Sequence, residues 1–235
     1  MNPKLRLAAF LALTAVSATT ACAPFNRAET RARAIRDSSY MPLDFTAPDS
    51  FLVAFETTRG RFDVMARTQW APIGVERFYE LVHRRFYDSV YFHRVVKGFV
   101  AQFGMNGNPD VGRAWAARRL LEDPVRQSNK RGTMSFARGG PNTRTTQVYI
   151  NLVDNIRLDT SATIGYTPFA EVVRGMEVVD SVTSEYGNAP NSVPDSARRT
   201  GVNAYFRRAF PKLDMIKTAR IIQEWRRPPV APPAK

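Results

Sequence analysis

The feature that most constrains the fold of this chain is a series of short apolar and β-branched runs beginning at residue 51. The first two runs, FLVAFETT and RFDVMAR, flank Arg59-Gly60, and this pattern predicts a β-hairpin. Helical patterns between the later runs are few, so the chain is expected to be mainly β. The later runs predict further strands at residues 89–96, 99–105, 132–137, 147–153, 168–173 and 214–225.

Two segments show a clear helical pattern. Pro72 suits the first turn of a helix, and the apolar residues from Val75 to Val82 recur at i, i+3, i+4 and i+7. A parallel α/β sheet would need a helix between most strands, so the pattern favours an all-β barrel or sandwich with helical caps. The other segments outside the strands are expected to form a short second helix at residues 176–182, a helical turn at 203–210, and long loops at 106–131 and 183–202.

The chain is expected to comprise four regions. Residues 1–22 have the pattern of an export signal, in which two basic residues precede an apolar run too short to span a bilayer. Residues 23–50 are polar, contain three prolines, and are interpreted as a flexible tether. The folded domain is expected over residues 51–225, followed by a Pro-rich tail at 226–235.

Cys22, the only cysteine, follows the small residues at the end of the export signal, and two processing routes remain open. A lipoprotein signal would be cut before Cys22, whose thiol would carry the lipid, although Thr19 stands where such signals usually place leucine. Ordinary signal-peptide cleavage after Ala23 would place Pro24 immediately after the cleaved bond, and cleavage before a proline is disfavoured. We therefore expect an exported protein of the cell envelope or periplasm, anchored to a membrane by a lipid at Cys22.

The charge of the chain is strongly basic, with a formal net charge of +13. Its arginines are scattered rather than gathered in one stretch, and no nucleic-acid-binding motif accompanies them. We interpret the excess as a solvated basic surface and do not expect a nucleic-acid partner.

Several classes of chemistry lack support in the sequence. The chain has two histidines and one cysteine, and it contains no HExxH, GxSxG, GxGxxG or GxxxxGK[ST] motif. No metal or cofactor is therefore expected. A domain of this kind either binds a partner or catalyses a reaction that needs no such group.

Three blocks of sequence carry a resemblance to a known family. FHRVVKGFVAQ spans residues 92–102, GGPNT and QVYI lie at 139–143 and 147–150, and FAEVVRGMEVV spans 169–179. In order and spacing these blocks resemble cyclophilin-type peptidyl-prolyl cis–trans isomerases, in particular a bacterial exported branch. The resemblance implies a closed eight-stranded antiparallel barrel capped by two helices, with an active site on its outer face. It also implies an enzyme that acts on extended or unfolded proline-containing chains, and we expect it to be a monomer.

The same resemblance implies roles for individual residues. Arg94 matches the catalytic arginine, and Gln102 matches the polar group that orients it. Twisting an X–Pro bond removes amide resonance across a barrier of about 18–20 kcal/mol, and a guanidinium can bond the nitrogen lone pair that appears only then. The positions matching substrate-binding residues are Phe99, Val100, Ala137, Arg138, Gln147, Tyr149 and Leu158.

Other interpretations of these residues stay open. Arg94 alone could be a surface ion-pair partner, Phe99 and Tyr149 could be core residues, and Gln102 could satisfy a buried backbone group. His93 is expected to be structural. As a whole, the domain could also be a cyclophilin-like peptide-binding module or holdase in which isomerisation is incidental.

Three positions depart from the family pattern. Arg157 stands where many cyclophilins have a tryptophan that borders the pocket and contacts cyclosporin. Tyr166 falls near a position that is often histidine, and Arg138 replaces a common asparagine. These departures bear on drug sensitivity and substrate preference more than on the basic reaction.

Overall fold

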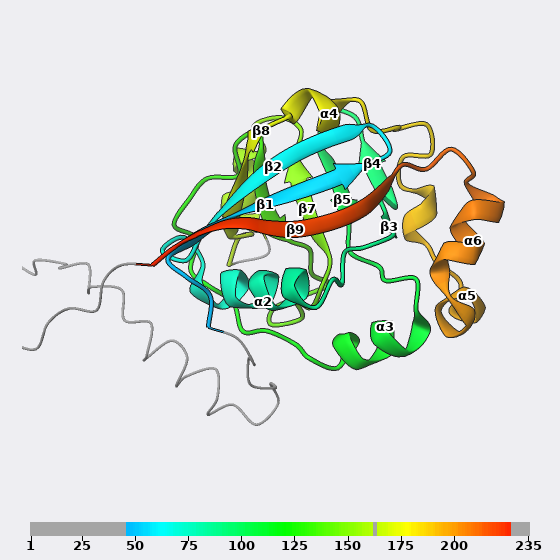
Figure 1. The fold of residues 1–235 in the computed structure, drawn as a ribbon, viewed down its shortest axis with the longest axis horizontal. Coiled ribbons are helices and arrows are strands. Elements are labelled where there is room, and N and C mark those ends of the chain that lie inside the picture. The colour runs from blue at the N-terminus through cyan, green and yellow to red at the C-terminus, as the bar shows by residue number, and fades with distance from the viewer. Residues whose placement is uncertain (1–45, 162–163, 227–235) are drawn as a thin grey trace, which may run out of the picture.

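The computed structural model describes residues 46–161 and 164–226 (Figure 1). The export signal with Cys22, the tether up to residue 45, and the tail from residue 227 lie outside the described residues. The described part contains one curled antiparallel sheet of nine strands, in the order β3-β9-β1-β2-β8-β6-β7-β5-β4. The strands are β1 (Ser50–Thr57), β2 (Gly60–Arg67), β3 (Val90–Tyr91), β4 (Arg94–Val96), β5 (Val100–Phe103), β6 (Thr133–Phe136), β7 (Val148–Asn151), β8 (Pro168–Arg174) and β9 (Met215–Trp225).

The predicted hairpin and first helix are confirmed. β1 and β2 pair from Ser50 opposite Arg67 to Thr57 opposite Gly60. Gly60 has φ +125°, a backbone conformation that suits glycine at the end of a tight turn. Helix α2 (Pro72–His83) begins with its proline in the first turn and packs across the sheet.

The number of strands differs from the expected eight. Residues 89–96, predicted as one strand, form β3 on β9 and β4 on β5, with Phe92 and His93 between them. Both side chains are fully buried: Phe92 packs against Phe103, whereas His93 stacks on Phe206 of another apolar cluster. Between Tyr91 and Arg94 the segment changes its pairing partner from β9 to β5. No ladder between described strands joins β3 to β4, so the sheet forms a half-barrel and the predicted closed eight-stranded barrel is not confirmed.

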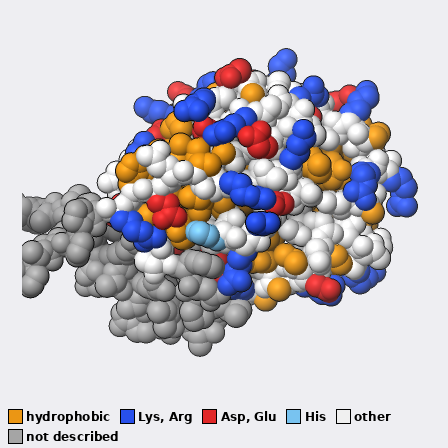
Figure 2. Space-filling model, in the orientation of Figure 1, with side chains coloured by type: hydrophobic (Ala, Val, Ile, Leu, Met, Phe, Trp, Pro, Cys, Tyr) orange, Lys and Arg blue, Asp and Glu red, His pale blue; other side chains and the backbone are white. Residues whose placement is uncertain are grey.

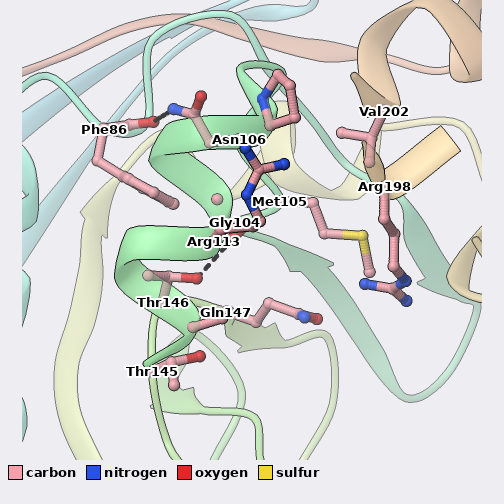
Figure 3. A pocket seen from close by; sticks show the side chains of 13 residues that line it. Phe86, Gly104, Met105, Asn106, Arg113, Thr145, Thr146, Gln147, Arg198 and Val202 are labelled. Carbon is pink, nitrogen blue, oxygen red and sulfur yellow. Dashed lines mark hydrogen bonds between the residues drawn. The ribbon is translucent and has the colours of Figure 1, made fainter. Parts of the chain in front are cut away.

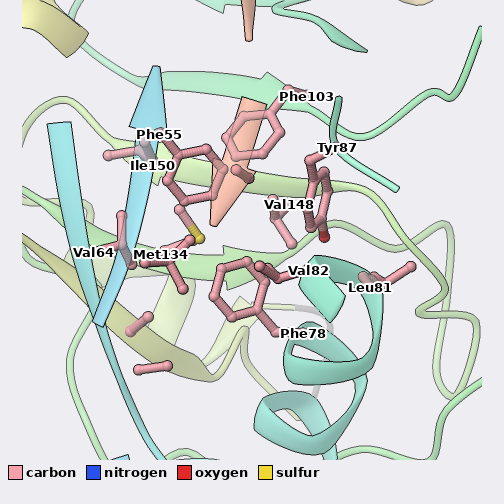
Figure 4. Packing of buried hydrophobic residues seen from close by; sticks show 14 of the residues in the cluster. Phe55, Val64, Phe78, Leu81, Val82, Tyr87, Phe103, Met134, Val148 and Ile150 are labelled. Carbon is pink, nitrogen blue, oxygen red and sulfur yellow. The ribbon is translucent and has the colours of Figure 1, made fainter. Parts of the chain in front are cut away.

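The main core fills the space between the sheet and α2 (Figure 4). Phe78 on α2 points into it, with ring centroids 5.9 Å from Phe51 and 5.0 Å from Phe169. Phe55 and Phe62, adjacent across the hairpin, stack at 4.8 Å. This dense aromatic packing fixes the scaffold from which the site residues project.

The structure contains more helices than the two expected. Asn108 caps α3 by accepting from the amides of Asp110 and Val111, so a helix forms inside the predicted loop 106–131. Within the described residues, no helix is both long and apolar enough to cross a lipid bilayer. The helices beyond α2 are α3 (Pro109–Ala116), α4 (Met176–Asp180), α5 (Asp195–Thr200) and α6 (Val202–Ala209), with 3-10 turns η1 (Ile156–Asp159) and η3 (Ala189–Asn191).

The region after α4 forms a second, smaller apolar cluster. The predicted loop 183–202 contains η3 and α5, and the predicted helical turn is α6. Ala197 and Phe206 pack here with Tyr91 and Leu213, which holds α5 and α6 against the β3 end of the sheet. On the face shown in Figure 2, the Lys and Arg side chains are spread among neutral and acidic ones.

Candidate active site

Arg94 and Gln102 lie directly opposite each other on β4 and β5. Cross-strand neighbours of this kind share one face of the sheet, so their side chains meet. Arg94 Nη1 donates to Gln102 Oε1 at 3.1 Å, and Gln102 Nε2 donates to Gln147 Oε1 at 2.9 Å. Three predicted site residues therefore form one hydrogen-bonded row.

A tight turn between β4 and β5 presents Phe99. Gly98 has φ +71° in that turn, and the Phe99 amide donates to the Val96 carbonyl at 2.9 Å. The Phe99 ring lies under the Arg94 guanidinium, with 5.4 Å from Arg94 Cζ to the ring centroid. This cation–π contact adds a second constraint on the position of the arginine.

These side chains border a cavity of about 280 Å³. Its apolar floor is a cluster separate from the main core, in which Val100, Tyr149 and Leu158 are buried and Phe99 and Ala137 pack against them. Tyr166 and Asn191 line this cavity together with eight of the nine predicted domain-site residues. These eight are Arg94, Phe99, Val100, Gln102, Ala137, Arg138, Tyr149 and Leu158.

The ninth residue, Gln147, lines a neighbouring polar cavity of about 300 Å³ that shares Gln102, Ala137, Arg138 and Asn191 with the first. A further cavity of about 190 Å³ lies behind Gln147, between α3 and the α5–α6 region (Figure 3). The cavity above the apolar floor thus shares part of its lining with a more polar neighbour.

Ala137 and Arg138 match family positions whose backbone pairs with an extended substrate. The Ala137 amide donates to the Gln147 carbonyl at 2.9 Å, so of its backbone groups only the carbonyl can bond a peptide. The Arg138 side chain is buried: it lies over Tyr166 and donates to the Gly165 carbonyl at 2.6 Å. This side chain therefore forms part of the cavity wall, and the substrate contact of the Arg138 backbone stays a prediction.

The electrostatics of the site single out Arg94. Partial burial lowers the pKa of Arg94, although a guanidinium stays charged at neutral pH. In the described part of the chain its hydrogen-bond partners are neutral amides and no carboxylate pairs with it. Its charge is therefore uncompensated at the edge of an apolar cavity, where it can act on a substrate.

Two neighbouring groups have structural roles. Burial lowers the pKa of His93 to about 4, so its ring is neutral at physiological pH, consistent with the structural role expected for it. Burial raises the pKa of Tyr149, whose hydroxyl donates to Asn129 Oδ1 at 3.1 Å. Neither group is placed to exchange a proton in the cavity near neutral pH.

Tyr166 and Asn191 line the cavity but are not among the predicted site residues. Tyr166 departs from the family pattern, and its ring packs on Tyr149 with 6.1 Å between the ring centroids. Asn191 belongs to η3, inside a segment expected to be a loop. No local pattern marks either position, because their place at the cavity depends on how distant segments pack.

Comparison with known proteins identifies the family. The model of the "Cyclophilin type peptidyl-prolyl cis-trans isomerase/CLD" family matches residues 52–200. The chain belongs to this family. Every predicted residue of the domain site falls within the matched range, and the enzyme is a peptidyl-prolyl cis–trans isomerase.

Bacterial relatives of this isomerase are about one third identical to it over the matched residues. A peptidyl-prolyl cis-trans isomerase of Acinetobacter baylyi is 35% identical over 146 residues, covering 60% of this chain and 78% of the relative. Peptidyl-prolyl cis-trans isomerase B of Escherichia coli is 34% identical over 142 residues, covering 56% and 83%. A solved cyclophilin type isomerase of Cryptosporidium parvum superposes with a TM-score of 0.55 at 18% identity, covering 75% and 99%, which supports the fold.

Proposed function

We propose that this isomerase binds a proline ring on the apolar floor of the 280 Å³ cavity and stabilises the twisted amide with Arg94. The observation that carries the proposal is the position of Arg94, which Gln102 and the Phe99 ring hold at the edge of that floor. A planar donor held in this way can bond the prolyl nitrogen when its lone pair localises. Because the interaction exists only in the twisted state, it lowers the barrier instead of merely tightening binding.

The substrates we propose are extended or unfolded chains. An extended peptide could follow the polar cavity beside Gln147 and bond the Ala137 carbonyl while its proline occupies the apolar floor. The reaction breaks no covalent bond and transfers no proton, so the site needs no metal, cofactor or titrating side chain. The neutral, buried state of His93 is compatible with this mechanism.

A protease-coupled assay on a proline peptide tests the catalytic proposal against the holdase alternative. We expect the isomerase to accelerate the cis-to-trans phase in proportion to its concentration. A holdase would instead suppress aggregation of an unfolded client without changing that rate. Suppression of aggregation with no acceleration on several peptides would therefore favour the binding-module interpretation.

We also propose that the isomerase works in the cell envelope and is tethered there by a lipid on Cys22. The support is the sequence pattern of residues 1–22, which lies outside the described structure. We expect the wild-type protein to partition with membranes and Cys22→Ser to be released or mis-processed. Mass spectrometry that found an unmodified mature N-terminus beyond residue 23 would contradict the lipid anchor and leave export intact.

Arg157 leads us to expect weak inhibition by cyclosporin. Its side chain is exposed on η1, and its Cζ lies 4.8 Å from the Phe99 ring centroid, on the ring that Arg94 also contacts. A flexible cation there replaces the flat apolar wall that a tryptophan would provide. We expect Arg157→Trp to strengthen inhibition by about tenfold in a titration of isomerase activity.

Arg157→Ala is the matched control, because it removes the cation without adding an indole. If Arg157→Ala strengthened inhibition as much as Arg157→Trp, the cation would be an obstacle and the indole contact would have no part. Tight inhibition of the wild-type protein would show that another group supplies the missing wall.

A further inference from the structure

The segment between α4 and α5 reaches the active site at Asn188. The Arg94 Nε donates to Asn188 Oδ1 at 2.6 Å, the shortest of the hydrogen bonds described for this guanidinium. Next to this contact, the Val95 amide donates to the Gly187 carbonyl at 3.3 Å. A segment almost a hundred residues away in sequence therefore packs against β4, the strand that carries the arginine.

The side chain of Asn188 has no local structural task that would explain its position. Asn188 is the N-cap residue of η3, with φ −89° and ψ −14°, and asparagine at such a position commonly accepts a hydrogen bond from the first-turn amides. Here its side chain makes no capping bond. Alanine would fit the same backbone conformation, so removing the amide need not disturb the turn.

The segment that carries Asn188 is held at both ends. Before it, the Thr183 amide donates to Asp214 Oδ2 at 2.8 Å. After it, Val193 and Ala197 are buried in the second apolar cluster beside Phe206. The amide oxygen of Asn188 is thus presented from an anchored part of the fold, which is what a positioning group requires.

Asn188 and Gln102 together leave Arg94 little freedom. Asn188 accepts a hydrogen bond from Nε and Gln102 accepts one from Nη1, while the Phe99 ring lies beneath the guanidinium group. Two bonds at different nitrogens restrict the direction of a planar guanidinium more than one bond can. In the described part of the chain Nη2 carries no hydrogen bond and Nη1 carries one, so the two N–H groups of Nη2 and the second N–H of Nη1 remain to meet a substrate.

We propose that Asn188 is a positioning residue for the isomerase reaction, which orients Arg94 from the α4–α5 segment. This inference rests on the proposed catalytic role of Arg94. Asn188 does not contact the prolyl bond in this account; it reduces the reorganisation that the guanidinium would otherwise need in the transition state. The segment 183–202 then completes the active site instead of merely connecting helices.

The test compares Asn188→Ala in the full chain with the wild type and with Ser192→Ala. Ser192 is exposed, adjoins the same 3-10 turn, and lines none of the cavities described above. We expect Asn188→Ala to lower kcat by about three- to tenfold with KM within about twofold, since the bond supports the transition state more than substrate binding. Ser192→Ala should leave both constants within about twofold of the wild type.

A double-mutant cycle with Arg94→Lys separates positioning from a general effect on the fold. Lysine has no counterpart of the guanidinium Nε donor, so Asn188→Ala should cost little further activity in the Arg94→Lys background. An equal loss in both backgrounds, or an equal loss in Ser192→Ala, would show that Asn188 acts through the structure of the segment and would overturn the inference. Unchanged activity of Asn188→Ala would also overturn it.

These outcomes are distinguishable from failure of the proposed mechanism. If Arg94→Ala kept full activity, the catalytic role of the arginine would fail, and the role of Asn188 with it. If Arg94→Ala lost activity while Asn188→Ala did not, only the positioning role would fail. Thermal melts of all variants show whether each one is folded.

Discussion

Arg94→Ala is expected to lower kcat/KM on a proline peptide by about 10²–10³-fold, the usual effect of deleting a preorganised donor aimed at a transition state. The expectation rests on the charge of Arg94, which faces the cavity edge and has only neutral hydrogen-bond partners in the described structure. Arg94→Lys should recover only part of the rate, because a point charge cannot reproduce a planar fork held at two nitrogens. Isomerisation rates from the protease-coupled assay measure both effects.

Folding should survive this substitution. Arg94 is half-buried and bonds to amides, so its removal leaves no carboxylate without a counter-charge. Lys97→Ala is the matched control: Lys97 is an exposed cation in the adjoining turn, and it lines none of the three cavities. We expect that variant to keep its rate within about twofold. An Arg94→Ala protein that melts normally and remains almost fully active would remove the catalytic assignment and favour the binding-module interpretation.

The largest expected effect on stability comes from Asp123, a carboxylate with a fully buried side chain in the segment between α3 and β6. Its two oxygens accept from the amides of Ile73 and Gly74 at 2.9 Å each, which caps the N-terminus of α2. Both terminal nitrogens of Arg144 also donate to it, at 3.1 Å. Negative charge at a helix N-terminus is favourable, and a buried guanidinium needs a partner.

Asp123→Ala should therefore lower the free energy of unfolding by about 3 kcal/mol, which corresponds to a fall of about 6–12 °C in Tm for a domain of this size. The value lies at the lower end of the range for broken buried ion pairs, because Glu122 still pairs with Arg144 Nε at 3.0 Å. Asp123→Asn should lose less, since the amide oxygen can still accept one of the helix amides.

Asp110→Ala makes the same change of charge on the surface and serves as the control. Asp110 is exposed and pairs with Arg113 one turn along α3. An exposed ion pair contributes little, so the loss should stay below about 1 kcal/mol. Equal losses in Asp110→Ala and Asp123→Ala, measured by urea or thermal unfolding, would show that the buried network does not stabilise α2 in the way described.

The sequence alone determined the features that depend on local patterns. The β1–β2 hairpin and α2 follow from alternation, turn residues and helical spacing within short windows, and the structure confirms both. The site was predicted from three blocks of sequence, and eight of its residues line one cavity, with Gln147 bonded to them. The family resemblance implied that Gln102 orients Arg94, and the structure places the two residues opposite each other on β4 and β5. The lipid anchor at Cys22 stays a prediction.

Only the tertiary structure decided the features that rest on contacts between distant segments. Residues 89–96 form two strands because the first pairs with β9 and the second with β5, and no local pattern encodes these two partners from distant parts of the chain. The cap of α2 comes from Asp123, about fifty residues along the chain. Asn188 meets Arg94 because α5 and α6 pack on the β3 end of the sheet and hold their segment beside β4. Single hydrogen bonds of this kind produce no periodic pattern in the sequence. Each needs only one suitable side chain, and the packing of the rest of the fold determines where that side chain lies.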